Sequence, residues 1–94
     1  PPTAEDGLRR LREGRPQAAE AVLLEVVEAR PQDARAWEAL VWTYQAMRDP
    51  VRAAEAGDQR QALLPDDERW TRTWLGLLEG VVDSAVAHAS NDRL

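Results

Sequence analysis

Three side chains that could act together in nucleophilic catalysis lie near the end of the chain. Ser84, His88 and Asp92 are spaced four residues apart, so on a helix the hydroxyl, the imidazole and the carboxylate share one face. These are the groups of a serine hydrolase triad, but that chemistry also needs an oxyanion hole and a substrate pocket. The neighbouring sequence is a polar terminal segment that indicates neither feature. We therefore expect no catalytic activity from this trio.

The remaining candidate ligands are too few for a metal centre. His88 is the only histidine and there is no cysteine, which excludes thiolate sites and histidine-rich sites. The acidic run Asp66-Asp67-Glu68 fits the start of a helix better than a cation site, because carboxylates interact favourably with the helix dipole there. No glycine-rich phosphate loop is present. The sequence thus predicts a non-catalytic protein without a metal or a cofactor.

The composition indicates a single domain over residues 1–94. The formal net charge of −5 disfavours nonspecific binding to nucleic acid. No apolar run reaches the roughly 20 residues that a membrane-spanning helix needs. The chain begins with Pro-Pro rather than Met, so we expect a processed chain or an excised piece, and the cellular compartment stays open.

Helix start and stop signals divide the chain into five or six helices. Thr3, Asp33 and Asp49 are predicted N-caps, since a side-chain oxygen there can accept from a free backbone N–H. Gly14 stands where a left-handed glycine commonly follows a helix. Pro16 fits a first helical position, where its missing N–H costs nothing. The predicted helices span approximately residues 4–13, 16–30, 34–47, 50–64 and 67 onward.

Apolar residues recur at three- and four-residue steps, which indicates an all-α fold. We interpret Trp37 and Trp74 as core residues and expect Trp70 to be half exposed. The predicted loops of two to four residues force neighbouring helices to run antiparallel. The predicted apolar stripes contain Leu8, Leu11, Ala19, Val22, Leu23, Val26, Val27, Ala36, Trp37, Leu40, Val41, Tyr44, Met47, a thin face of Ala53, Ala54, Gly57 and Leu64, and then Trp70, Trp74, Leu77, Leu78 and Val81.

A repeat of 34 residues connects two parts of the chain. The segment that starts at Pro31 is similar to the segment that starts at Pro65, and the same step relates Ala53 to Ala19 and Ala87. A period of this length is typical of helix-turn-helix units that stack side by side. Such stacks usually hold other polypeptides rather than perform chemistry.

The residues at these positions resemble the tetratricopeptide repeat, a helical hairpin of 34 residues. The central unit, about 34–65, has the family's aromatic, leucine and tyrosine in its first helix, followed by its small residue and its closing proline. The first unit, about 3–31, has Thr3 where the aromatic belongs. The third, about 67–90, is partial. The matching residues are Trp37, Leu40, Tyr44, Ala53 and Pro65, then Gly7, Gly14, Ala19, Leu23 and Pro31, then Trp74 and Ala87.

This resemblance implies a short right-handed solenoid of about two and a half repeats, with antiparallel hairpins and a concave groove lined by the first helix of each unit. A peptide or a helix of a partner protein usually lies in that groove. The residues that map to it are Arg35, Glu38, Trp42 and Gln45 in the central unit, Ala4, Leu8, Leu11 and Arg12 in the first, and Arg69, Arg72, Gly76 and Glu79 in the third.

Trp42 is the predicted anchor of the groove. It points away from the core stripe of its own helix, and a large aromatic on a groove is a typical binding residue. The alternative is that Trp42 packs on a neighbouring repeat. Nearby arginines, namely Arg12, Arg35, Arg69 and Arg72, favour a partner segment that carries carboxylates beside an apolar side chain, although they can also form a solvated face.

Two interpretations remain for the segment after residue 80. The repeat predicts a turn near Val82-Asp83 and a sixth helix from Ser84, whereas the local pattern allows one continuous helix. Gly80 either helps to end the helix or forms a smooth strip with Gly76 that another helix can approach. We expect the break.

Three residues depart from the family pattern in the central unit. Val41 and Arg60 replace small residues, and Gly57 replaces a bulky core side chain. We therefore expect the helix over residues 50–64 to be loosely packed, or to pack on something outside the chain.

The sequence thus predicts a protein-binding scaffold, with two alternatives. The chain can be a segment of a longer solenoid or a self-associating unit, because fewer than three repeats bury little surface. Its free apolar ends would then be Val81, Val82 and Val86 on one side and Leu8 and Leu11 on the other. It can also be an accessory domain of a larger enzyme.

Overall fold

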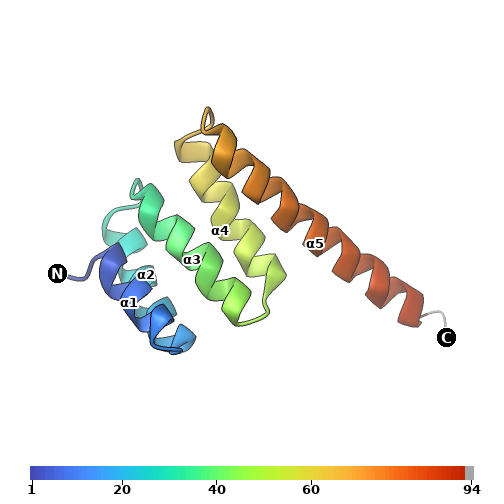
Figure 1. The fold of residues 1–94 in the computed structure, drawn as a ribbon, viewed down its shortest axis with the longest axis horizontal. Helices are drawn as coiled ribbons and strands as arrows, with labels where there is room; N and C mark the ends of the chain where they lie inside the picture. Colours follow the sequence, from blue (N-terminus) through green and yellow to red (C-terminus); the bar gives the residue numbers. More distant parts are fainter. Residues whose placement is uncertain (93–94) are drawn as a thin grey trace.

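The structure, a computed structural model, describes the backbone of residues 1–92 and the side chains of residues 1–83. Five α-helices and no strand occur in this part of the chain, as the sequence predicts for an all-α protein. They are α1 (Ala4–Arg12), α2 (Pro16–Ala29), α3 (Ala34–Ala46), α4 (Pro50–Leu63) and α5 (Glu68–Asp92). Connections of three or four residues join them, and successive helices run back and forth across the molecule (Figure 1).

The helix starts follow the predicted capping signals. Thr3 and Asp6 form a reciprocal capping box at α1. The carboxylates of Asp33 and Asp49 accept from backbone N–H groups three residues later, at 3.1 Å each. Gly14 has a φ of 77°, the left-handed conformation that ends α1 at little cost for a residue without Cβ. Local chemistry therefore sets the boundaries of these helices.

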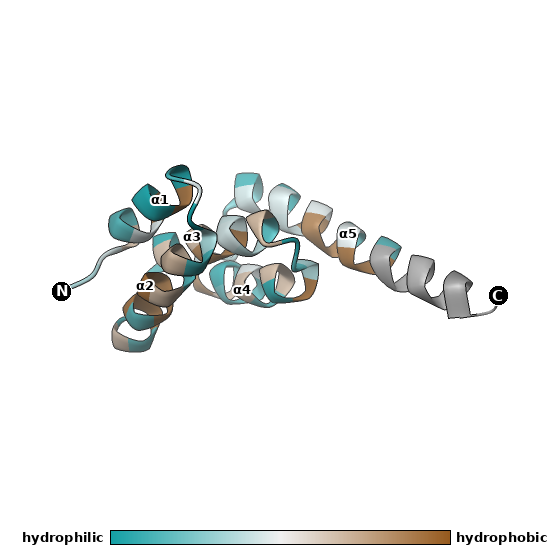
Figure 2. Cartoon of the chain, turned by 90° about the horizontal axis from the view of Figure 1, so that it is seen from below, coloured by the Kyte–Doolittle hydropathy of each residue, from teal (hydrophilic) through white to brown (hydrophobic). Residues whose placement is uncertain are grey.

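α3 is the central helix of the fold. It packs against α1, α2 and α4, whereas the backbone of α5 approaches only that of α4. Seen from the edge, α2 and α4 lie below α1 and α3 (Figure 2). Alanines at the crossings, among them Ala19, Ala36 and Ala53, are fully buried, and their small side chains let the backbones approach closely. Leu23, Leu40 and other apolar residues fill the remaining core.

The predicted break after residue 80 is wrong, because α5 continues through Val82-Asp83 to Asp92. No proline interrupts this stretch, and an exposed glycine such as Gly80 costs only about 1 kcal/mol relative to alanine. Gly80 therefore does not end the helix, and there is no separate sixth helix within residues 1–92.

The prediction that the fourth helix is loosely packed is also wrong. Trp74 of α5 lies directly on Gly57, where an added Cβ would be 2.7 Å from the indole Cδ1. Arg60 is buried and Val41 is fully enclosed. The absence of a side chain at Gly57 is thus compensated by a tryptophan from the next helix. Trp70, expected to be half exposed, is only 4% exposed, because it lies under the Arg60 side chain.

Candidate functional site

A hollow between α3 and α5 is the best candidate for a binding site. No Cα atom of α3 lies within 8 Å of a Cα atom of α5 in the described chain, so side chains alone bridge the gap. The hollow has a volume of about 460 Å³. Its lining residues come from three helices and the loop before α5: Glu38, Trp42, Arg60, Asp67, Arg69, Trp70 and Thr73.

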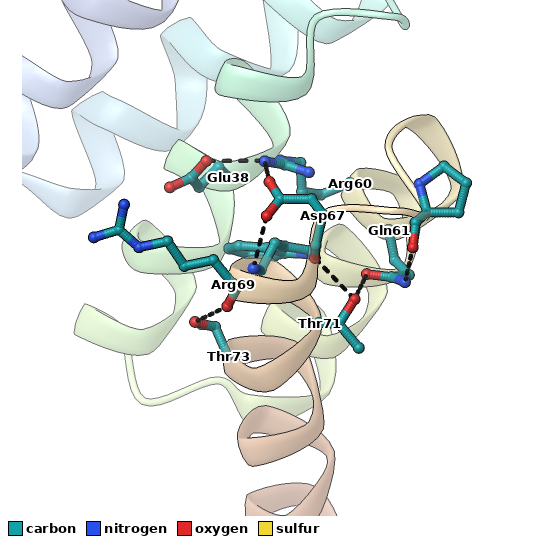
Figure 3. Close-up of polar contacts among 9 residues, drawn as sticks. Glu38, Arg60, Gln61, Asp67, Arg69, Thr71 and Thr73 are labelled. Carbon is teal, nitrogen blue, oxygen red and sulfur yellow. Dashed lines mark hydrogen bonds and ion pairs between the residues drawn. The ribbon is translucent and has the colours of Figure 1, made fainter.

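Arg60 holds the floor of the hollow together. Its side chain is 8% exposed, and its Nη2 donates to Asp67 Oδ2 at 2.9 Å. Its Nε lies 3.6 Å from Glu38 Oε2, which makes an ion pair with α3. The guanidinium also lies 5.0 Å from the centre of the Trp70 ring, a cation–π distance. One arginine of α4 therefore joins α3 to the start of α5 (Figure 3).

Asp67 has two roles at this position. Its Oδ1 accepts from the backbone N–H of Trp70 at 3.1 Å and so caps α5, while its Oδ2 accepts from Arg60. The Arg60 hydrogen bond, followed by the Trp70 N–H, lowers the pKa of Asp67, because both stabilise the ionised form. The acidic run before α5 is therefore a helix cap, as predicted, and it also fixes the direction of α5 through Arg60.

Trp42 forms one wall of the hollow and is 39% exposed. Its ring meets the ring of Trp70 edge-on, with the centroids 6.4 Å apart and an interplanar angle of 82°. One edge of Trp42 therefore packs on α5, while another part of its surface stays accessible. An aromatic ring held in this way presents apolar surface at little further cost in side-chain entropy.

Arg69 lies on the α5 side of the hollow. Its side chain is exposed, and it forms no ion pair within the described residues. At the floor of the hollow, the Nε and Nη1 atoms of Arg60 have no hydrogen-bond acceptor in the described protein and are shielded from water. The four charged groups of the hollow sum to zero, with two arginines and two carboxylates. The two carboxylates both pair with Arg60, so Arg69 is the one charged group of the hollow without an ion-pair partner among the described residues.

The other predicted groove residues do not join this hollow. Arg35 of α3 pairs with Glu5 of α1, and a hydrogen bond to that carboxylate raises the pKa of Arg35. Leu8 packs against the core. Residues that lie exposed elsewhere are Arg12, Gln45, Gly76 and Glu79. Arg72 borders a different depression, beside Pro65 and Asp66, and Ala4 is buried.

The structure therefore brings together Trp42, Glu38 and Arg69 from the predicted set. It adds Arg60, Asp67, Trp70 and Thr73, which the sequence did not identify as lining residues. One feature of the sequence pointed to Arg60, since this long, charged side chain stands where the tetratricopeptide pattern usually has a small residue. Asp67 was recognised only as a cap, since its contact with Arg60 depends on how α4 and α5 cross.

A second, smaller hollow lies on another side of α3. Residues of α2, α3 and α4 surround about 300 Å³ there, including Leu24, Trp37 and Arg52. Trp37 Nε1 donates to the Pro31 carbonyl at 2.7 Å, which supports its predicted structural role. Burial, with a smaller contribution from the Glu20 carboxylate, raises the pKa of the neighbouring Tyr44 to about 12.

The remaining predicted features concern catalysis, metals and membranes. The side chains of Ser84, His88 and Asp92 lie outside the described residues. In the described part, no three histidine, cysteine or acidic side chains gather as a metal site, and no helix combines the length and apolarity needed to cross a membrane.

No protein-family model, curated protein or solved structure matches this chain, so the candidate site is defined by its own geometry.

Proposed function

We propose that this chain is a non-catalytic, tetratricopeptide-like scaffold that binds a short segment of a partner protein in the hollow between α3 and α5. The 34-residue period and the succession of helical hairpins support the repeat assignment. The observation that carries the binding role is that the accessible Trp42 and Arg69, which forms no ion pair with the described residues, line one hollow whose floor Arg60 holds together. Tryptophan and arginine are the residue types that most often dominate binding energy.

The preferred segment has an apolar side chain next to a carboxylate. The apolar group covers the exposed part of Trp42, and the carboxylate accepts two parallel hydrogen bonds from the Arg69 guanidinium. Glu38 opposes this partner, because its carboxylate also borders the hollow. The sign of each charge effect is therefore fixed in advance: removal of Arg69 weakens binding, and neutralisation of Glu38 strengthens it.

The test is selection of peptides from a random display library on the purified chain, followed by titration of the selected peptides. We expect enrichment of aspartate or glutamate beside an aromatic or aliphatic residue. Trp42→Ala and Arg69→Ala should each weaken binding by about tenfold or more, as hot-spot residues do, and Glu38→Gln should strengthen it. Enrichment of basic peptides would refute the proposed chemistry.

Two control substitutions lie outside the hollow, one on α5, which also carries Arg69, and one on α2. Arg72→Ala removes an exposed arginine of α5 outside the hollow, and Leu24→Ala removes an exposed apolar side chain on α2. Both should leave peptide affinity unchanged. A thermal melt of each variant checks the fold, and Trp42→Ala should remain folded because its ring is partly in water. If Trp42→Ala unfolds the chain, or if the controls lose as much affinity as Arg69→Ala, the assignment of the hollow is wrong.

A further inference from the structure

The face of α5 that turns away from α4 carries an uncovered apolar stripe. Leu75 is 50% exposed and Val82 is 59% exposed. Leu78 lies between them at helical spacing and is partly exposed, so its predicted place in the core is wrong. We call this surface the end face; it consists of Arg72, Leu75, Leu78, Glu79, Val82 and Asp83. Apolar residues that repeat at steps of three and four along a free helix are the pattern of a helix-pairing seam.

The end face is separate from the peptide hollow. On α5 the side chains of Trp70, Trp74 and Leu77 turn toward α4 and the core, and those of Arg69 and Thr73 turn into the hollow. The end face occupies the remaining side of the helix. Since α5 is the last helix in the row, and α4 and Trp42 of α3 lie on its other sides, no described residue covers this side (Figure 1). Apolar residues are visible along the middle of α5 in Figure 2.

We propose that the end face docks on the end face of a second copy of this chain, with the two α5 helices antiparallel. The charges along the stripe support this choice. Arg72 precedes Leu75, Glu79 follows Leu78, and neither forms an ion pair within the described residues. When Leu75 lies opposite Leu78 of the second copy, Arg72 lies within a turn of Glu79 of that copy, and the symmetry makes this contact twice. A parallel pair would not bring Arg72 near Glu79, because each residue would then lie at the height of its own like-charged copy.

Docking on the other end of a second copy is less favourable. At that end, Leu8 and Leu11 of α1 already pack on the core, and the exposed residues of α1 include Arg9 and Arg12. A head-to-tail contact would therefore pair the apolar stripe with a charged helix. The antiparallel arrangement covers both stripes at once and closes after two copies, as twofold interfaces do.

The experiment is sedimentation equilibrium of the chain over a wide concentration range. We expect a monomer–dimer equilibrium that Val82→Glu abolishes, because the substitution places a charge in the apolar stripe. The matched control is Val51→Glu on α4, where the valine is 54% exposed and lies outside the end face. It should leave the dimer unchanged. A monomer at every concentration, or a dimer that survives Val82→Glu, overturns the proposal.

Charge reversal tests the antiparallel orientation. Arg72→Glu should weaken the dimer on the order of tenfold, because it replaces attraction by repulsion at two symmetric pairs. Glu79→Arg should do the same, and the double variant Arg72→Glu/Glu79→Arg should restore the wild-type association constant. If the double variant is weaker than either single variant, the helices do not pair in this orientation. Far-UV circular dichroism of every variant separates loss of pairing from loss of fold.

Discussion

Addition of one methyl group at Gly7 tests the packing of the first hairpin. A Cβ at this position would lie 2.4 Å from both Cγ and Cδ2 of Leu23 and 2.9 Å from its Cδ1. Favourable carbon–carbon contacts are about 3.5–4.0 Å, so the overlap exceeds 1 Å by this comparison. Leu23 is fully buried, so it can move only by displacing other atoms of a closely packed core. Gly7→Ala therefore forces α1 away from α2.

The expected magnitude follows from two opposing contributions. Alanine in a helix interior is favoured over glycine by about 1 kcal/mol, and overpacking of a filled core costs about 1–3 kcal/mol. Because three atoms of one buried side chain are affected, we place the cost at the upper end, which leaves a net loss of about 2 kcal/mol in the free energy of unfolding. Urea denaturation followed by far-UV circular dichroism and tryptophan fluorescence measures this difference.

Gly76 provides a matched control on α5. It is exposed, and an added Cβ meets nothing within 4 Å, so Gly76→Ala should raise the free energy of unfolding by about 0.5–1 kcal/mol. The change in the free energy of unfolding caused by a glycine-to-alanine substitution thus has opposite signs at these two helical positions. The double variant Gly7→Ala/Leu23→Ala should lose less free energy of unfolding than the two single variants lose in sum. The methyl group added at residue 7 would occupy part of the cavity left by the Leu23 side chain. Equal or greater stability of Gly7→Ala relative to wild type would refute the proposed packing.

Two further predictions concern pH. The pKa of Asp67 is lowered from 3.8, so its ionised form stabilises the fold above that value, and this contribution disappears as the pH falls through the lower, folded pKa. Asp67→Asn should therefore be less stable than wild type at neutral pH, with a difference that shrinks in acid denaturation series. Burial raises the pKa of Tyr44 from 10.0 to about 12, so its contribution is complete below pH 10 and is lost as the pH rises to 12. Ultraviolet titration of the phenolate should give this raised midpoint, and an unshifted midpoint in the folded chain would contradict its burial.

Much of the fold could be predicted because its signals are local. Thr3, Asp33 and Asp49 cap the helices that follow them, and Gly14 has the left-handed conformation expected after α1. These features depend on contacts across three or four residues, which the sequence displays directly. The end of α5 was harder to predict, because a 34-residue period and the local helical pattern disagreed there.

The candidate site was harder to predict from the sequence. Trp42 and Arg69 were identified through the repeat, but Arg72 and Arg35 were grouped with them although they lie elsewhere. From the sequence, Arg60 was interpreted as a residue that loosens the packing of α4. In the structure it is buried and joins α3 to the cap of α5. A repeat assigns residues to a helix face only approximately, and it does not describe how side chains from three helices meet.

The sequence by itself determined where the helices begin, their order and their antiparallel connections, because caps, prolines and apolar periodicity act within a few residues of the chain. Only the tertiary structure decided that Trp74 fills the space at Gly57, that Arg60 meets Glu38 and Asp67, and that one stripe of α5 is left uncovered. These outcomes depend on the crossing and separation of helices that are distant along the chain. Such distances result from the packing of all the side chains together, so no local pattern specifies them.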